Sequence, residues 1–211
     1  VTSTTVYSNP VTIKEAFAKL YAGLSMSGQD VTNSPDIATS DVGSNVFLRN
    51  YWDAQELPTD EAVIGWNDHD IQAYHSMNWT PNCYFVQLMY DRVFFEVAAC
   101  NEFLRETDKL DLSKFSAQDT TDIAGYRYEA RFLRALAYWT GIDMFGNIPF
   151  TTEQDPVGSF FPKQISRTDL FNYVESELLA IQDHLPDPGQ NEYGRADKGA
   201  AWMLLAELYL N

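Results

Sequence analysis

One stretch, residues 128–150, constrains the fold more than any other part of the chain. Its apolar side chains recur at the spacing of one helical face, at Phe132, Leu133, Leu136, Trp139 and Ile142. Alanines between them leave room for a closely packed neighbour. Gly146 can take the left-handed conformation that ends a helix, and Pro149 prevents the helix from resuming. The stretch therefore predicts a buried helix with a defined end.

Four further helices are expected. A capping box at Thr12–Glu15 predicts the start of the first, and the others are expected from about residue 82, over residues 167–184 and from about residue 196. The last carries a tetratricopeptide-like pattern at Trp202, Leu205, Ala206 and Tyr209. Its helical phase places Trp202 in the core, as it does Trp139. The predicted fold class is all-α, with tetratricopeptide-like helical hairpins and long irregular loops.

Residues 29–82 show no sustained periodicity, and they carry Trp52, Trp66 and Trp79. A segment this long without a long element is functional, disordered or threaded between helices. Because disordered segments are poor in aromatic residues, the tryptophans argue against disorder.

Within this segment, flat rings alternate with hydrogen-bonding side chains. Sugars present apolar C–H faces and rings of hydroxyls, and a binding pocket combines an apolar lining with a few placed polar groups. The expected ligand-binding residues are Trp66, Asn67, Asp68, Tyr74, His75, Asn78 and Trp79. The alternative is that the tryptophans wedge the loop against the helices, since tryptophan is mostly buried.

Charge, cysteine spacing and hydropathy each exclude one feature: a nucleic-acid partner, a disulfide and a membrane span. The chain has 211 residues and a net charge of −16, so nucleic acid is not expected as a partner. Cys83 and Cys100 are expected on one long helix, about 25 Å apart at 1.5 Å per residue, too far for a disulfide. No stretch is apolar enough to predict a membrane span.

Catalytic and metal motifs are weak. His184 is expected to cap a helix end, and Asp68-His69-Asp70 lacks the pattern of a calcium loop. Asp60 and Glu61 are adjacent, whereas glycosidase carboxylates come from separated positions. We therefore expect no catalytic residue, no metal site and no cofactor.

Three ordered motifs resemble the SusD/RagB family of outer-membrane nutrient-binding lipoproteins. Glu129-Ala130-Arg131-Phe132-Leu133-Arg134-Ala135 is followed by Phe145-Gly146-Asn147-Ile148-Pro149-Phe150. The second motif covers residues 165–179, and the third begins at Gly194-Arg195-Ala196-Asp197. The resemblance covers most of the chain but only the N-terminal part of a typical member. Residues 1–211 are thus expected to form a single SusD-like N-terminal helical domain, a fragment of a longer chain.

The resemblance implies non-catalytic capture of an oligosaccharide or starch-like polysaccharide. Delivery would be to a SusC-like, TonB-dependent outer-membrane transporter, from a surface-exposed lipoprotein. No cysteine precedes Val1, so an N-terminal lipid anchor would lie outside this sequence. The resemblance assigns no ligand contact residue by residue and does not name the glycan.

Two other functions stay open at this point. One is a tetratricopeptide-type scaffold for protein–protein interaction, in which the tryptophan-rich loop would be packed. The other is an enzyme such as a glycosidase, which requires two carboxylates across a cleft.

Overall fold

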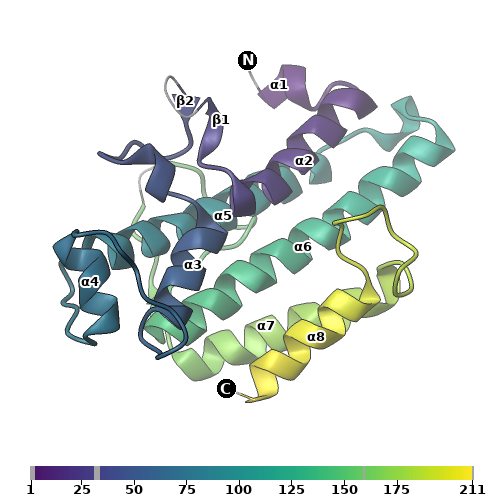
Figure 1. Cartoon of the computed structure of the whole chain (residues 1–211). Coiled ribbons are helices and arrows are strands. Elements are labelled where there is room, and N and C mark those ends of the chain that lie inside the picture. The colour runs from purple at the N-terminus through teal and green to yellow at the C-terminus, as the bar shows by residue number, and fades with distance from the viewer. Residues whose placement is uncertain (1–2, 31–33, 159, 211) are drawn as a thin grey trace. The chain divides into compact units, whose positions relative to one another are not determined.

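The computed structural model describes residues 3–30, 34–158 and 160–210, and it is mainly helical (Figure 1). The predicted class, all-α with helical hairpins and long irregular loops, is confirmed. The α-helices are α1 (Ser3–Val6), α2 (Pro10–Ser25), α3 (Phe47–Glu56), α4 (His69–His75), α5 (Tyr84–Asp108), α6 (Ala117–Phe145), α7 (Arg167–Ile181) and α8 (Lys198–Leu210). Short 3-10 helices are η1 (Val42–Ser44), η2 (Leu112–Lys114) and η3 (Gln182–His184).

The chain divides into two compact units. One comprises Val1–Tyr21 and Glu96–Asn211, and the other comprises Ala22–Phe95. Helices α2 and α5 each contribute residues to both units. The expectation that residues 1–211 form a single domain stays a prediction.

Helix α6 is the longest element of the first unit. It begins at a capping box, in which the Ser116 side chain accepts from the Asp119 backbone N–H and the Asp119 carboxylate accepts in return. It ends at Gly146, whose φ is +72°, so the predicted end is confirmed. The next strand, β3 (Ile148–Pro149), pairs antiparallel with β4 (Gln164–Ile165), leading the chain into α7.

Helices α6, α7 and α8 contact one another along this unit (Figure 1). Buried charges lie between α6 and α7. Arg131 Nη2 donates to Glu177 Oε1 at 2.8 Å, and Arg134 Nη2 donates to Glu177 Oε2 at 3.0 Å. Arg134 also pairs with the Glu153 carboxylate. Because the Arg134 side chain is nearly fully buried, its positive charge is stabilised by these two carboxylates, Glu153 and Glu177.

The structure corrects the predicted start of the first helix. Helix α2 begins at Pro10, not at Thr12, which lies inside the first turn. Asn9 precedes the helix, and its side-chain oxygen accepts a hydrogen bond from the Thr12 backbone N–H at 3.1 Å. Proline suits this position because it lacks an N–H and its φ is already helical.

Trp202 is not a core residue, in contrast to the prediction. Helix α8 is apolar on all sides, and its buried face carries Ala201, Leu204, Leu205 and Leu208. Trp202 lies on the other side, 50% exposed, and its indole N–H donates to Gln182 Oε1 at 3.0 Å. Trp139 is buried as predicted.

The second unit contains two helices that sequence periodicity does not reveal, α3 and α4. Strands β1 (Gly28–Asp30) and β2 (Ser34–Pro35) pair antiparallel, with Gly28 opposite Pro35. An apolar cluster holds the two helices and the start of α5 together; it contains Leu57, Ile71, Tyr74, Cys83, Phe85 and Leu88.

Cys83 and Cys100 are both buried and free, as expected. Only Cys100 lies on α5, because the helix begins at Tyr84, one residue after Cys83. None of the helices in the described ranges is both long and apolar enough to cross a bilayer.

Candidate functional site

A hollow of about 400 Å³ lies within the Ala22–Phe95 unit, at the N-terminal end of α4. Three segments line it: the loop leading into η1, the loop leading into α4, and the first turn of α5. The lining residues are Ser40, Asp41, Ser44, Trp66, Asp68, His69, Asp70, Tyr84 and Phe85.

Trp66 supplies a flat apolar surface in this hollow. Its side chain is 48% exposed, and the Arg49 guanidinium carbon lies 4.8 Å from the centre of its ring. This distance is within the range of a cation–π contact. Arg49 is held in turn, because its Nη1 donates to the Gly43 carbonyl at 3.0 Å. The indole is therefore oriented before any ligand arrives.

The Tyr84 hydroxyl fixes the facing loop. It accepts from Ser40 Oγ at 3.2 Å and from the Asp41 backbone N–H at 3.3 Å. Asp41 then caps η1, accepting from Ser44 Oγ at 2.6 Å. This side-chain hydrogen bond lowers the pKa of Asp41 below its ordinary value.

Asp70 links the start of α4 to the start of α5. Its Oδ2 accepts from the Tyr84 backbone N–H at 2.8 Å, and its Oδ1 lies 3.1 Å from His69 Nδ1. The Tyr84 N–H, followed by His69, lowers the pKa of this carboxyl. Asp41 and Asp70 thus stay ionised as hydrogen-bond acceptors, whereas a general acid needs a raised pKa.

The structure brings together only part of the set predicted from sequence. Trp66 and Asp68 line the hollow, and Asn67 is exposed between them without lining it. His75 ends α4, and Asn78 and Trp79 follow it, all exposed. Since α4 has seven residues, about 10 Å of helix separates these two groups.

Tyr74 does not fit its predicted role as a ligand contact. Its side chain is only 3% exposed, and it belongs to the apolar cluster of the unit. Its ring meets the Trp79 ring edge-on at 6.0 Å. Helical phase explains the difference, because Ile71 and Tyr74 share the inward face of α4, which the sequence had not revealed as a helix.

The tryptophans of this segment are neither fully packed nor fully exposed. Trp52, Trp66 and Trp79 are 50%, 48% and 46% exposed. Only Trp66 of the three lines the hollow.

Sequence reasoning missed Asp41, Arg49 and Tyr84. Asp41 and Ser44 form a local cap, Asp-x-x-Ser, that is readable in the sequence as a turn. Arg49 and Tyr84 carry no such pattern, because their role depends on α3 and α5 meeting the two loops.

His184 lies in the last turn of η3, at a helix end as expected, and its ring stacks on Tyr128, with ring centres 4.4 Å apart and planes 3° from parallel. In the parts of the chain that the structure describes, no group of three or more His, Cys, Asp or Glu side chains is arranged to hold a metal ion.

Three comparisons with known proteins were informative to different degrees: family models gave no match, whereas a curated relative and solved structures did. No family model matches the chain. It is 36% identical over 197 residues to the starch-binding protein SusD of Bacteroides thetaiotaomicron, covering 92% of this chain and 34% of that protein. The chain thus spans about a third of the length of that relative.

Two solved structures share the fold. One is a SusD-like carbohydrate binding protein from Bacteroides fragilis, with a TM-score of 0.72 and 21% identity, covering 97% of this chain and 37% of that chain. The other is surface glycan-binding protein A from Bacteroides uniformis, with a TM-score of 0.70 and 21% identity, covering 96% of this chain and 42% of that chain. At these identities the likeness shows the fold alone.

Proposed function

Because the chain belongs to the SusD family, of which it represents the N-terminal portion, we propose that it binds a glycan in the hollow beside Trp66. The Trp66 ring, held under Arg49 and half exposed, is the observation that carries the proposal. It offers a flat apolar surface to the C–H face of a sugar.

The polar lining suits the hydroxyls of the same sugar. Asp41 and Asp70 are acceptors with lowered pKa values, and Asp68 is exposed beside them. Ser40 and His69 also line the hollow, and they add a hydroxyl and an imidazole. A few placed polar groups around an apolar surface are typical of a small-ligand pocket.

The whole protein, on this proposal, captures a starch-like glycan without hydrolysing it and passes it to a SusC-like transporter at the outer-membrane surface, as a lipid-anchored protein. The name of the relative from Bacteroides thetaiotaomicron supports starch as the first ligand to test. The downward pKa shifts of Asp41 and Asp70 support binding over acid catalysis.

A protein-interaction scaffold explains the site less well. In such a scaffold the tryptophan-rich segment would be packed, yet Trp52, Trp66 and Trp79 are each about half exposed.

Calorimetric titration of the full chain with maltoheptaose, and with a panel of other neutral and acidic oligosaccharides, tests the function. We expect Trp66→Ala to weaken binding about thirtyfold or more, the loss of a hot-spot aromatic. Trp52→Ala is the matched control, because Trp52 is equally exposed but lies outside the hollow. Chromatography of the mixture should show no released product.

Trp79→Ala tests which end of α4 holds the site: the end with Trp66 and Asp68, or the end with His75, Asn78 and Trp79. Loss of binding in Trp79→Ala but not in Trp66→Ala would move the site to the far end of α4. Wild-type protein that binds no oligosaccharide of the panel would contradict the function itself.

A further inference from the structure

We propose that the other compact unit, Val1–Tyr21 with Glu96–Asn211, carries a second glycan-binding site, in a groove between α2 and the N-terminal half of α6. The inference rests on the proposed glycan-binding function. It concerns a different surface, and no residue of the Trp66 hollow takes part in it.

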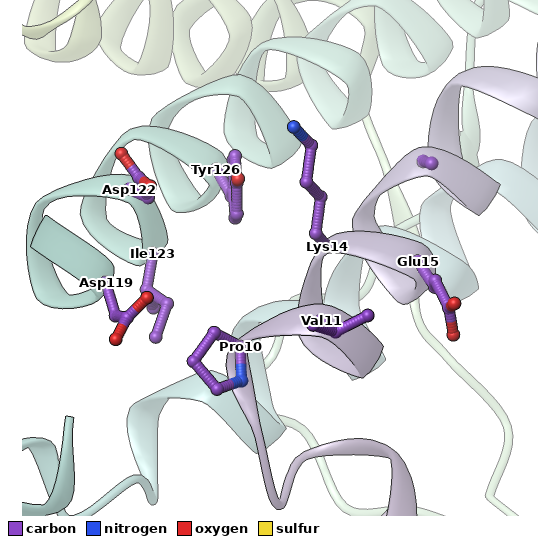
Figure 2. A pocket seen from close by; sticks show the side chains of 9 residues that line it. Pro10, Val11, Lys14, Glu15, Asp119, Asp122, Ile123 and Tyr126 are labelled. Atoms are coloured by element: carbon purple, nitrogen blue, oxygen red, sulfur yellow. The ribbon is translucent and has the colours of Figure 1, made fainter. Parts of the chain in front are cut away.

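The groove consists of two adjoining hollows of about 450 and 440 Å³. Figure 2 shows the first, with Lys14 extending from α2 and with Asp122 and Tyr126 facing it from α6. The same three residues also line the second hollow, so the two are continuous around the Lys14 side chain.

The first hollow is mainly apolar. Pro10 and Val11 form one wall, and the Ile123 side chain lies on the opposite wall (Figure 2). Tyr126 is buried between two neighbours: its ring stacks on Phe17 with centres 4.4 Å apart, and the Arg195 guanidinium carbon lies 5.2 Å from the centre of the same ring. The exposed Val11 side chain and the Pro10 ring beside it are therefore the apolar surface that this hollow offers to the C–H face of a sugar ring.

The second hollow has an aromatic wall and an open floor. Tyr128 and His184 stack in parallel, and the pair presents flat rings to the space. Gly125 lies in the floor, where an added Cβ would meet no atom within 4 Å. The hollow is therefore not filled by side chains packed over α6.

The charges around the groove are paired. Lys14 Nζ lies 3.5 Å from Glu192, and Arg195 lies 2.5 Å from Glu129 and 3.4 Å from Glu192. Neither cation is thus available to pair fully with a phosphate or sulfate. The exposed ammonium of Lys14 and the carboxylates of Glu192 and Asp122 can still exchange hydrogen bonds with hydroxyls.

A neutral, polyhydroxylated chain fits this combination best, because successive sugar units can occupy the two hollows on either side of Lys14. A protein with two such sites engages a long polysaccharide twice, which raises the effective concentration at the second contact when the chain reaches both.

The test uses the full chain carrying Trp66→Ala, which disables the first site. We expect it to retain weaker, saturable maltoheptaose binding in calorimetry. In hydrogen exchange, the glycan should protect residues 119–129 and 186–196. Adding Gly125→Leu should weaken this residual binding at least about tenfold, the loss of a well-packed contact region.

The matched control is Ala117→Leu, at the exposed start of the same helix and outside both hollows. Leucine favours the helix over glycine, so Gly125→Leu should fold; circular dichroism checks this. The second site is overturned when wild type binds but Trp66→Ala shows no saturable binding. It is equally overturned when Gly125→Leu leaves the residual binding unchanged or when protection lies elsewhere. Wild type that binds no glycan removes the proposed function and this site together.

Discussion

Arg92 shows how a single buried cation can organise a loop. It is fully buried, and its Nε donates to Asn45 Oδ1 at 2.9 Å and its Nη1 to Asp36 Oδ2 at 3.2 Å. Its Nη2 also donates to the Ser27 carbonyl at 3.2 Å. These partners lie on either side of the loop that carries Asp41, so Arg92 on α5 supports one wall of the Trp66 hollow.

Replacing Arg92 should therefore unfold this unit or loosen its site. Arg92→Met removes the guanidinium from beside the buried Asp36 carboxylate, a change that costs about 3–5 kcal/mol. Urea denaturation should show this loss in the free energy of unfolding. Lys114→Met is the control, because Lys114 and the Asp111 carboxylate beside it are both exposed and we expect little or no loss. Equal losses in the two variants would contradict the organising role of Arg92.

Glu177 makes the stability of the unit formed by Val1–Tyr21 and Glu96–Asn211 depend on pH. Burial alone would raise the pKa of its carboxyl, but Arg131 and then Arg134 outweigh burial and hold the pKa below its ordinary value of 4.5. A carboxyl with a depressed folded pKa stabilises the protein above its unfolded pKa. This stabilisation is lost as the pH falls through the lowered value.

We accordingly expect stability to fall as the pH is lowered from about 4.5. Glu177→Gln should be less stable at pH 7 and should lose less on acidification, because one of the titrating groups is gone. Glu153 has a lowered pKa as well, so part of the acid sensitivity should remain. Thermal unfolding of both proteins between pH 3 and 7 measures the difference, and parallel curves would contradict the assignment.

At the scale of an element, α6 offers a pair of glycines in contrasting backbone conformations. Gly146 has a φ of +72°, whereas Gly125 lies within the helix, and an added Cβ meets no atom within 4 Å at either site. Gly146→Ala should destabilise the protein by about 1–2 kcal/mol, because a positive φ strains a residue with a Cβ. Gly125→Ala should stabilise it by about 0.5–1 kcal/mol. Denaturant unfolding should show the free energy of unfolding falling in Gly146→Ala and rising in Gly125→Ala. Changes of the same sign in both variants would show that packing, and not backbone conformation, determines the effect of the added methyl group.

Helices α6 and α7 were predictable from sequence because each has a readable start, and α6 also has a readable end. Ser116-x-x-Asp119 and Ser166-x-x-Asp169 cap α6 and α7, and Gly146 ends α6. Helix α3 was not predictable, since its buried face carries Asn50 and Asp53 beside Phe47, which masks the apolar period. Helix α4 has only seven residues, too few to show one.

The candidate site was predictable only where its chemistry is local. Trp66 and Asp68 stand in the aromatic and polar stretch that sequence composition reveals. Arg49 and Tyr84 join them through tertiary packing, and Tyr74 leaves the set because α4 turns it inward. A pattern of residue types cannot distinguish the inner face of an unrecognised short helix from its outer face.

Over the whole molecule, charge should decide which polysaccharides are captured. The net charge is −16, and the lowered pKa values of Asp41 and Asp70 keep negative charge in the Trp66 hollow itself. A sulfated or uronic acid polymer meets this field as a like charge, whereas a neutral glucan does not. Repulsion between exposed charges is screened by salt, since the Debye length falls from about 30 Å at 0.01 M to about 8 Å at 0.15 M.

We therefore expect the affinity for maltoheptaose to change little, less than about twofold, between these two ionic strengths. Any binding of an anionic oligosaccharide of similar length should be weaker and should strengthen as salt is added. Calorimetric titrations of the full chain at both ionic strengths measure this, with Trp66→Ala reporting whether the same hollow is used. Tighter binding of the anionic chain at low salt would show that a local cationic surface, such as Arg49 freed from Trp66, outweighs the charge of the whole protein.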